Sequence, residues 1–395
     1  MSAWPIVALE DVFAVARGGS PRPIDSFITD DPTGVNWIMI GDASEGSKYI
    51  SSTKKRIIKE GVKKSRMVSA GDFLLTNSMS FGKPYILKTS GCIHDGWLVL
   101  SPRHDQIHSD FFYYLLGSDL LYSNFKKLAA GAVVKNLNSE LVRGVQIPLP
   151  PLAEQKRIAA ILDAADALRA KRREALAQLD ALLQSSFLTL FGDPVTNPMG
   201  WEVAPMTSIS EILTGFAFPS GKYLVNGDGI ALCRGINVGL GSLSWDERVD
   251  WNSSYEAKLD RYELKRGDII LAMDRPWISG GLKAATVTES DLPSLLVQRV
   301  ARIRANDLAS QSLLYALIKH PVFERHCRPT ETTIPHISPL ELKSFPVILP
   351  PLPLQQKFAT IVESVERQKA AQRAHLAELD ALFAALQHRA FRGEL

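Results

Sequence analysis

Two stretches of this chain, 200 residues apart, carry closely similar sequences. Residues 150–183 align without a gap to residues 350–383, and 14 of the 34 aligned positions are identical. Both stretches open with Pro-Pro-Leu and contain Leu-Asp-Ala-Leu, and Gln155 in the first matches Gln355 in the second. A repeat of this size predicts two structural units of the same kind, so the fold must accommodate a duplicated half.

Each repeat predicts a long helix. A proline suits the first helical turn, because its missing N–H would have no partner there. Roughly 38 residues without glycine or proline follow in each copy, and at 1.5 Å per residue they form a rod of roughly 55 Å. The first helix is predicted to end at Phe191-Gly192-Asp193-Pro194, and the second in the segment Phe391–Leu395.

The apolar residues of both predicted helices recur every three or four positions, which indicates one narrow packing stripe, interrupted at Arg172 and Gln372. A narrow stripe on so long a helix needs a partner helix. We expect the two copies to pack antiparallel as a coiled-coil-like rod; the alternative is a coiled coil between two copies of the chain. The residues expected to pack in the rod are Ile158, Ile161, Leu176, Leu179, Leu182, Phe358, Ile361, Leu376, Leu379 and Leu382.

The segments that precede the two helices also correspond, although less closely. Each contains a Gly-Asp turn followed by an apolar run, then an aromatic-rich amphipathic helix, then an Ile/Val-rich strand that leads into the double proline. The predicted fold class is therefore α+β, with two mixed α/β modules separated by the long helices and related by a pseudo-twofold repeat. The expected domains are a first module at 1–150, a helix at 151–192, a second module at 193–350 and a helix at 351–395.

The composition excludes several classes of protein. No apolar run reaches the ~18 residues of a membrane helix, and the sequence does not open with a signal-peptide pattern. Its 3 cysteines lie far apart, which argues against a disulfide framework or a zinc site. We therefore expect a cytoplasmic protein. The formal net charge of +3 favours an anionic partner only slightly.

A search of the sequence for catalytic motifs finds none. It has no Asn/Asp-Pro-Pro-aromatic segment of adenine methyltransferases, no Gly-x-x-x-x-Gly-Lys-Ser/Thr phosphate loop and no Gly-x-Ser-x-Gly elbow. Glu-x-Lys triplets occur, but no Pro-Asp precedes them at the spacing of nucleases. His104 with His108, and His320 with Glu324, lack a third metal ligand. The expected function is binding, with no catalytic residue, metal or cofactor in this chain.

The first repeat resembles the central conserved region of type I restriction–modification specificity subunits. The residues that carry the resemblance are Ile147–Ile158 and the Phe-Gly-Asp-Pro that ends the helix. The second repeat, closing on Phe391–Leu395, resembles the C-terminal conserved region of the same family. Residues 18–21 and 37–42 resemble parts of its target-recognition domains.

The resemblance implies that each module reads one half of a bipartite target in double-stranded DNA. The helices would set the spacer between the halves and dock two methyltransferase subunits, and restriction and translocase subunits would join the complex. S-adenosylmethionine, Mg²⁺ and ATP would act in those partner subunits. Half-sites on one face of B-DNA lie about 34–36 Å apart per helical turn, a distance that a rod of roughly 55 Å can span.

The candidate DNA contacts are polar residues in basic or glycine-containing segments, since phosphates need Lys or Arg and base edges need side-chain donors and acceptors. The segment from Lys54 to Arg66 carries seven cations and one acid, Glu60. In the first module the candidates are Arg22, Lys54, Lys55, Arg56, Lys63, Lys64, Arg66, Asn77, Ser78, Ser80, Lys83, Lys135 and Asn136. In the second module they are Arg275, Trp277, Ser279, Arg328, Thr330, Thr332 and His336.

Two other functions are compatible with the repeat. One is a protein-interaction scaffold with a duplicated helical rod, whose modules bind peptides. Because phosphate binding weakens steeply with salt, the salt dependence of binding separates this scaffold from a DNA-binding subunit. The other is a nuclease with a degenerate site, which would cleave DNA by itself when magnesium is added.

Overall fold

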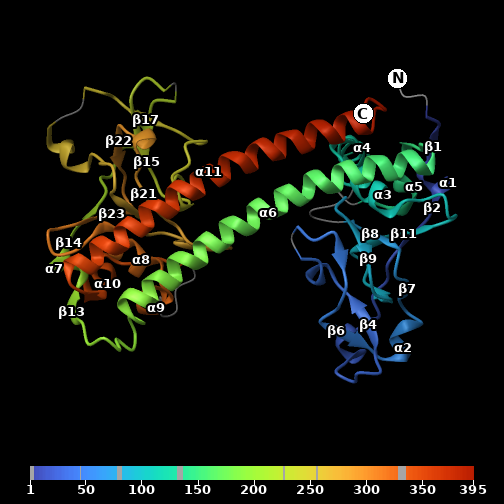
Figure 1. Cartoon of the computed structure of the whole chain (residues 1–395), viewed down its shortest axis with the longest axis horizontal. Helices are drawn as coiled ribbons and strands as arrows, with labels where there is room; N and C mark the ends of the chain where they lie inside the picture. The colour runs from blue at the N-terminus through green and yellow to red at the C-terminus, as the bar shows by residue number, and fades with distance from the viewer. Residues whose placement is uncertain are drawn as a thin grey trace. The chain divides into compact units, whose positions relative to one another are not determined.

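The computed structural model describes residues 4–44, 46–77, 82–130, 137–225, 227–254, 257–327 and 335–395. The chain forms two compact units. Unit 1 comprises Met1–Glu174 together with Arg373–Leu395, and unit 2 comprises Ala175–Gln372. Each unit therefore contains one of the predicted modules and half of each long helix, as the colours of Figure 1 show.

The described residues of unit 1 form two five-stranded sheets and a two-stranded ribbon. The first sheet has the order β2-β11-β8-β9-β5, with strands β2 (Phe13–Arg17), β5 (Tyr49–Ile50), β8 (Phe73–Thr76), β9 (Pro84–Leu87) and β11 (Trp97–Pro102). The second has the order β3-β6-β4-β10-β7, with strands β3 (Ile28–Thr29), β4 (Val35–Ile38), β6 (Lys55–Ile57), β7 (Arg66–Val68) and β10 (Gly91–Ile93). The ribbon pairs β1 (Ile6–Ala8) with β12 (Gln146–Pro148), the strand that leads into the first double proline.

The short helices of unit 1 are α1 (Leu9–Val12), α2 (Lys59–Val62), α3 (Ser109–Leu116), α4 (Asp119–Ala130) and α5 (Ser139–Arg143). Helix α3 is the predicted aromatic helix, and it contributes Phe111 and Phe112 to the core. The Phe13 ring of β2 lies edge-on to Phe112 at 5.0 Å and to Phe73 of β8 at 5.5 Å. These contacts fix the first sheet against the helices.

Unit 2 repeats this plan with different details. Its main sheet has the order β14-β23-β18-β21-β16, with strands β14 (Ser210–Thr214), β16 (Leu240–Gly241), β18 (Ile269–Ala272), β21 (Ala284–Thr286) and β23 (Val300–Ala305). The smaller sheets are β17-β15-β22, β13-β24 and β19-β20, with strands β13 (Glu202–Pro205), β15 (Ile230–Cys233), β17 (Asp250–Trp251), β19 (Trp277–Ile278), β20 (Gly281–Leu282), β22 (Ser294–Leu296) and β24 (Pro346–Leu349). Its short helices are α7 (Met206–Ile209), α8 (Gln311–Lys319), α9 (Pro321–His326) and α10 (Pro339–Ser344).

The two Gly-Asp turns precede buried strands, as predicted. Gly71 and Gly267 have φ angles of 98° and 89°, in the left-handed region where glycine has no steric cost. The carboxylates of Asp72 and Asp268 accept hydrogen bonds from backbone N–H groups three residues earlier, at 2.8 and 2.7 Å. Strands β8 and β18, which follow, are buried along their whole length.

Two long helices are present, α6 (Leu152–Phe191) and α11 (Leu352–Ala390). Each is drawn without a break in Figure 1. Within each unit the halves of α6 and α11 pack antiparallel. In unit 1 residues late in α11 contact residues early in α6, and in unit 2 residues late in α6 contact residues early in α11. The predicted α+β class with two long antiparallel helices is confirmed. No helix in the described part of the chain is long and apolar enough to cross a membrane.

Charged residues join the two helices at equivalent positions in the two units. Arg169 Nε lies 2.6 Å from Asp380 Oδ1 in unit 1, and Lys369 Nζ lies 2.8 Å from Asp180 Oδ1 in unit 2. Adding 200 to 169 and 180 gives 369 and 380, so one ion pair is the repeat of the other. The sequence repeat is therefore also a pseudo-twofold repeat of side-chain contacts.

The packing face of the helices differs in part from the predicted stripe. Ile158 and Phe358 are buried, whereas the side chains of Leu182 and Leu382 are 46% and 49% exposed, so the prediction that these two leucines pack in the rod is wrong. One residue along a helix turns the side chain by about 100°, and the next positions, Leu183 and Phe383, lie on the inner face instead. The remaining predicted residues (Ile161, Leu176, Leu179, Ile361, Leu376 and Leu379) are half-buried.

The predicted interruption of the stripe is absent as well. Arg172 and Gln372 are half-buried and continue the same face of their helices. The ion-paired residues Arg169 and Lys369 also lie on this face, one turn away. Long side chains with apolar stems can occupy a packing face when their charged ends are satisfied.

Each long helix begins with the same buried glutamine. Gln155 Oε1 accepts the backbone N–H of His108 at 2.9 Å, and Gln355 Oε1 accepts that of Ser310 at 2.7 Å. Each amide nitrogen donates to the carbonyl of the first proline in its own Pro-Pro pair, at 2.9 and 2.8 Å. The repeated glutamine thus joins the start of each helix to the module before it.

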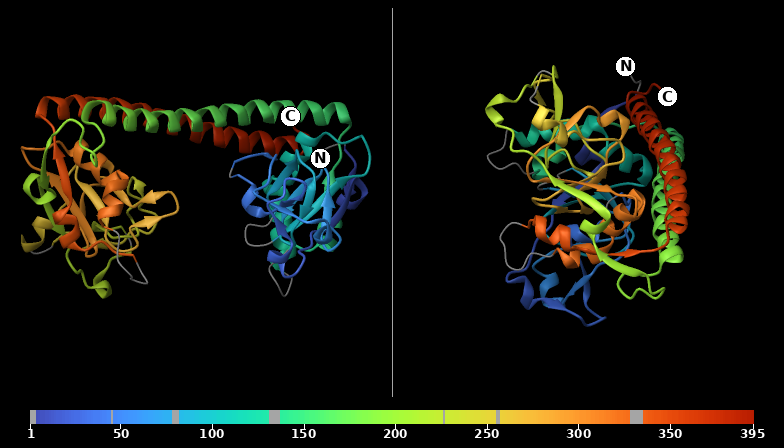
Figure 2. Two further views of the ribbon diagram at one scale, coloured as in Figure 1. Left: turned by 90° about the horizontal axis from the view of Figure 1, so that it is seen from below. Right: turned by 90° about the vertical axis from the view of Figure 1, so that its left-hand side faces the viewer.

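The helix ends are fixed by phenylalanines. Phe191, at the end of α6, lies edge-on to Phe358 of α11 at 5.3 Å, within unit 2. Phe391, which follows α11, lies edge-on to Phe111 of α3 at 5.7 Å, within unit 1. Figure 2 shows the two helix halves of each unit side by side on one flank of the sheets.

Candidate nucleic-acid interface

Three connecting segments meet at one end of the main sheet in each unit. They are the segments after β2, after β8 and before β11 in unit 1, and those after β14, after β18 and before β23 in unit 2. In unit 1 the antiparallel register pairs Arg17 with Leu98 and Trp97 with Thr76. The ends of β2 and β8 therefore lie beside the start of β11. In unit 2 the same register pairs Thr214 and Ala272 with the first residues of β23. We call this end of the sheet loop cluster 1 in unit 1 and loop cluster 2 in unit 2.

Backbone hydrogen bonds hold the two clusters in the same way. Asn77 N–H donates to Gly96 O at 3.1 Å, and Leu137 N–H donates to Asn77 O at 3.0 Å. In unit 2, Met273 N–H donates to Arg299 O at 2.9 Å, and Ile337 N–H donates to Met273 O at 2.8 Å. The sequence prediction placed candidates on the loop after the Gly-Asp strand and on the approach to the last strand, and these bonds bring the two segments together.

Loop cluster 1 is organised around Asp95. Its carbonyl accepts Asn77 Nδ2 at 2.7 Å and Arg17 Nε at 3.1 Å. Its carboxylate accepts the hydroxyl of Ser20 at 2.7 Å, and this hydrogen bond holds the pKa of Asp95 below its usual value. The predicted contact Arg22 has a side chain 85% exposed, 4.0 Å from the same carboxylate.

His94 and Gly96 make the turn before β11 very tight. Gly96 N–H donates to His94 Nδ1 at 2.7 Å, and a Cβ on Gly96 would lie 2.2 Å from Cε1 of that ring. Burial lowers the pKa of His94 below its usual value, so the ring stays neutral at pH 7. A side chain at position 96 would therefore displace the His94 ring.

Loop cluster 2 is built from charged residues instead. Asp274 forms an isolated β-bridge with the predicted contact His336, and Arg275 N–H donates to Pro335 O at 2.9 Å. Arg275 and His336 are exposed. Arg299 Nη1 lies 2.6 Å from Asp274 Oδ2. Loop cluster 2 thus contains two arginines and a histidine together with Asp274, whose carboxylate binds Arg299.

The candidates Trp277 and Ser279 lie in a short hairpin that follows Arg275. Trp277 is half-buried in β19, which pairs with β20, and Ser279 is exposed in the turn between them. Lys83 of unit 1 is also exposed and lies opposite Thr76, because its N–H donates to Thr76 Oγ1 at 3.1 Å. These three residues therefore flank the loop clusters.

The basic run divides into two parts. Lys54, Lys55 and Arg56 lie at or in β6, where Lys55 pairs with Trp37 of β4. The other part, Lys63, Lys64 and Arg66, follows α2 and enters β7. Arg66 Nε donates to Arg17 O at 2.6 Å, which brings this second part next to loop cluster 1. All of these cations are exposed except Arg56, which is half-buried.

Several predicted contacts lie outside the described residues. They are Ser78, Ser80, Lys135, Asn136, Arg328, Thr330 and Thr332. These seven residues stay predictions.

The sequence prediction missed Asp95, in the segment before β11, and Arg299, in the equivalent segment before β23; it also missed Ser20, in the segment after β2. Neither Asp95 nor Arg299 lies in a basic run, and although Asp95-Gly96 is a turn signal, nothing in the sequence places that turn beside Asn77. Arg299 has a φ of 63°, an unusual backbone conformation for a non-glycine residue that only the structure reveals.

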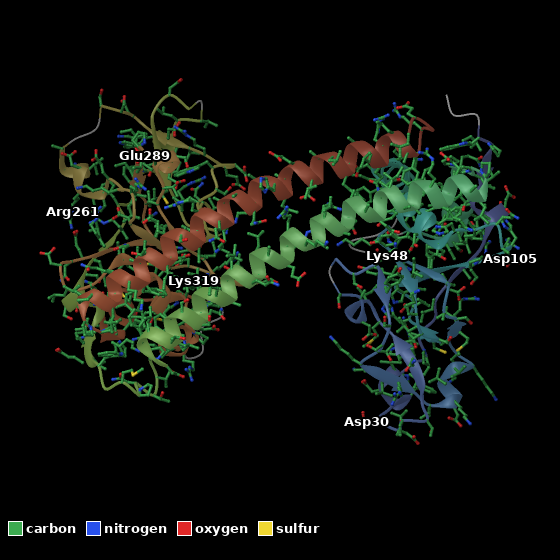
Figure 3. The ribbon with its side chains drawn as sticks, in the orientation of Figure 1. Asp30, Lys48, Asp105, Arg261, Glu289 and Lys319 are labelled. Atoms are coloured by element: carbon green, nitrogen blue, oxygen red, sulfur yellow. The ribbon has the colours of Figure 1, made fainter. Side chains whose placement is uncertain are left out.

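A polar cluster joins module 1 to α6. Lys48 Nζ lies 2.6 Å from Asp110 and 2.9 Å from Asp163 of α6, whose carboxylate also accepts the Tyr114 hydroxyl at 2.6 Å. Burial lowers the pKa of Lys48, but the hydrogen bonds to both carboxylates raise it more, so the net pKa lies above its usual value. Figure 3 labels Lys48 beside α6 and, in unit 2, Lys319 beside the long helices. Within the described residues, no group of three His, Cys, Asp or Glu side chains could hold a metal ion.

Comparison with known proteins finds matches along most of the chain. The family model described as the type I restriction modification DNA specificity domain matches residues 1–178 and again 198–381. The type I restriction enzyme MjaVIII specificity subunit of Methanocaldococcus jannaschii is 25% identical over 379 residues, which cover 92% of this chain and 86% of that protein.

Two solved structures share the fold. One is a chain of a type I R-M system described for its complex assembly and conformational transition; it has a TM-score of 0.55 and 20% identity, over 99% of this chain and 98% of that one. The other is a type I restriction-modification system S subunit from M. genitalium, with a TM-score of 0.54 and 14% identity, over 99% of this chain and 96% of that one.

Proposed function

Because this chain belongs to the type I restriction modification DNA specificity family, we propose that it is the DNA-reading subunit of a type I restriction–modification complex. Each module reads one half of a bipartite target. The long helices set the spacer between the halves and dock the methyltransferase subunits. Methyl transfer from S-adenosylmethionine and ATP- and Mg²⁺-dependent cleavage belong to partner subunits, and this chain is not itself catalytic.

One observation carries this proposal. The two units present the same three-segment cluster at the same end of the same sheet, held by equivalent backbone hydrogen bonds. The side chains on the clusters differ: Ser20, Asn77 and Asp95 in unit 1, against Asp274, Arg275 and Arg299 in unit 2. A duplicated scaffold with different polar groups suits two modules that each recognise a different short sequence.

The chemistry of the cluster residues suits DNA. Lys and Arg contribute phosphate contacts, which position a protein on the duplex without reading its sequence. Arg, Asn, Ser and Asp side chains supply the donors and acceptors that distinguish base edges in the major groove. The second part of the basic run lies next to loop cluster 1 through the Arg66–Arg17 hydrogen bond, so phosphate and base contacts are available at one surface of unit 1.

The test is the methylation pattern of cells that express the chain together with its modification subunits. We expect methylated adenines within one two-part motif. Arg275→Ala with Trp277→Ala should relax the base preferences of one half and leave the other intact, at about 1–3 kcal/mol per lost base contact. If both halves change together, a composite surface reads the site and the proposal of one module per half is wrong.

The basic run supplies a second arm of this test. Replacing Lys54, Lys55 and Arg56 by alanine should weaken binding of the complex to all sequences and reduce the salt dependence by roughly one unit of slope per lost phosphate contact. The methylated motif should stay the same. A changed motif would show that these cations read bases.

A further inference from the structure

The two loop clusters differ at one position in a way that bears on what they read. Gly96 and Arg299 are equivalent, because each accepts the same hydrogen bond, from Asn77 and from Met273, and each directly precedes the equivalent strand, β11 or β23. A side chain at position 96 would collide with His94. Unit 1 therefore has no side chain where unit 2 has a long cationic one.

The backbone of loop cluster 2 is unfavourable for the residues it carries. Arg275 and Arg299 have φ angles of 45° and 63°. Non-glycine residues rarely adopt this left-handed conformation, because their Cβ approaches the neighbouring carbonyl. Strained backbone of this kind concentrates at sites where the side chain has a function. Folding alone would favour glycine at position 299.

The side chain of Arg299 is exposed and oriented. Its guanidinium is bound by Asp274 at 2.6 Å through Nη1, yet the side chain is 74% exposed. Asp274 itself is held by the β-bridge to His336. A carboxylate that binds one nitrogen of a guanidinium restricts its rotation, while the planar fork keeps further N–H donors for a second partner.

We propose that Arg299, oriented by Asp274, is a guanine-reading residue of unit 2; this rests on the proposed function above. A guanidinium donates two parallel hydrogen bonds to O6 and N7 of guanine, the commonest specific contact in the major groove. An arginine that is already oriented loses less side-chain freedom when it binds. Arg299 acts on the base, and Asp274 is its positioning residue.

The central variant is Arg299→Gly. Glycine favours the left-handed conformation and is the residue that unit 1 has at this position, so the variant should fold at least as well as the parent chain. In the complex with the modification subunits, the guanine preference at one position of one half-site should fall about tenfold or more. The other half-site should keep its bases. Asp274→Asn should weaken the same preference less.

The matched control is Arg266→Ala. Arg266 is also exposed, and its replacement by alanine removes the same positive charge. It lies in the turn before β18, at the opposite end of that strand from Asp274. This variant should leave every base preference unchanged. Thermal unfolding of all three variants checks that folding is not the cause of any change.

The outcomes separate the inference from the proposed function. Loss of one guanine preference in Arg299→Gly, with the control unchanged, supports the inference. An unchanged motif, or a uniform loss of methylation with the same motif and a smaller salt slope, overturns it, since Arg299 would then be idle or bound to phosphate. If the parent complex shows no sequence motif at all, the proposed function fails first and the inference fails with it.

Discussion

Single side chains at matched positions perform matched tasks in this chain. Gln155 and Gln355 are both 1% exposed, and each makes three hydrogen bonds to backbone groups, one at the start of its helix and two in the module before it. Buried backbone groups need partners, so a side chain that supplies several at once is hard to replace. This explains why glutamine recurs where the adjoining residues have diverged.

Gln155→Ala and Gln355→Ala should therefore destabilise their units to a similar extent, by about 1–3 kcal/mol each, because each leaves buried backbone groups without partners. Chemical denaturation of the full chain measures the free energy of unfolding. Gln356→Ala, at an exposed position one residue away, is the control and should cost less than about 0.5 kcal/mol. Equal values for Gln355→Ala and Gln356→Ala would show that the hydrogen bonds are unimportant.

A second residue-scale prediction concerns Asp95. The hydrogen bond from the Ser20 hydroxyl lowers the pKa of this carboxyl below its usual value of 3.8. The ionised carboxylate therefore stabilises the folded state at a pH above the pKa of the unfolded state. This stabilisation is lost as the pH falls through the lower pKa of the folded state. Ser20→Ala should raise the pKa of Asp95 towards 3.8, and carboxyl NMR titration measures it. Ser52→Ala, at an exposed position outside the cluster, should leave it unchanged. An unshifted pKa in Ser20→Ala would contradict the prediction.

At the scale of elements, the long helices combine an apolar face with buried cations. Lys369 is 8% exposed and lies on the packing face of α11, where it is bound by Asp180 of α6 and by Glu366 of its own helix. Burial lowers the pKa of Lys369, but these hydrogen bonds raise it more, and the net pKa lies above 10.5. A polar pair within an apolar face favours one alignment of the helices, since any shift leaves a buried charge unpaired.

Lys369→Ala should reduce the free energy of unfolding by about 1–2 kcal/mol, less than for a fully buried pair because Asp180 is more than half exposed. A double-mutant cycle with Asp180→Ala isolates the coupling between the two. The Glu363–Arg367 pair on the same helix has both side chains 76% exposed and is the control, with an expected coupling of at most about 0.5 kcal/mol. Equal couplings would show that burial of Lys369 adds nothing.

The same pair has a defined pH dependence. Because the folded pKa of Lys369 lies above 10.5, its stabilisation is complete below that pH and declines as the pH rises through the folded value. The difference in stability between the parent chain and Lys369→Ala should therefore be constant through neutral pH and shrink only in strong alkali. A difference that shrinks on acidification from pH 8 to pH 6 would contradict this assignment.

At the scale of the whole molecule, the ion pairs define where the helices can be lengthened without disturbing their contacts. Arg169–Asp380 and Asp180–Lys369 lie symmetrically about the junction Glu174–Ala175 in α6 and the equivalent junction in α11, between Ala374 and His375. Seven residues added at both junctions keep the three-four spacing of the packing face. Each of the two ion pairs then stays on one side of both insertions.

Such a double insertion lengthens the helices by about 10 Å. We expect the preferred spacer of the methylated motif to lengthen while both half-site sequences stay the same, because the loop clusters are untouched. Genome-wide methylation measures this, and substitution of seven existing exposed positions without a change of length is the control. A motif with an unchanged spacer would show that the helices do not determine it.

Much of this protein follows from its sequence alone. The 200-residue repeat, the long helices and the Gly-Asp strands depend on local pattern, and the structure confirms all three. The loops after the Gly-Asp strands were predicted as contact sites for the same reason. Leu182 and Leu382 were misplaced because each has an apolar neighbour, Leu183 or Phe383, and the sequence pattern does not say which of the two faces the partner helix.

The tertiary structure alone decided which segments meet. Asp95 and Arg299 reach the loop clusters only because β11 and β23 pair antiparallel with two strands each, and the register of strands far apart in the sequence depends on packing rather than on local pattern. The left-handed backbone of Arg299 and its contact with Asp274, 25 residues away, are likewise products of that register. Repeat and helices are local properties of the chain, whereas the composition of each cluster is a property of the folded sheet.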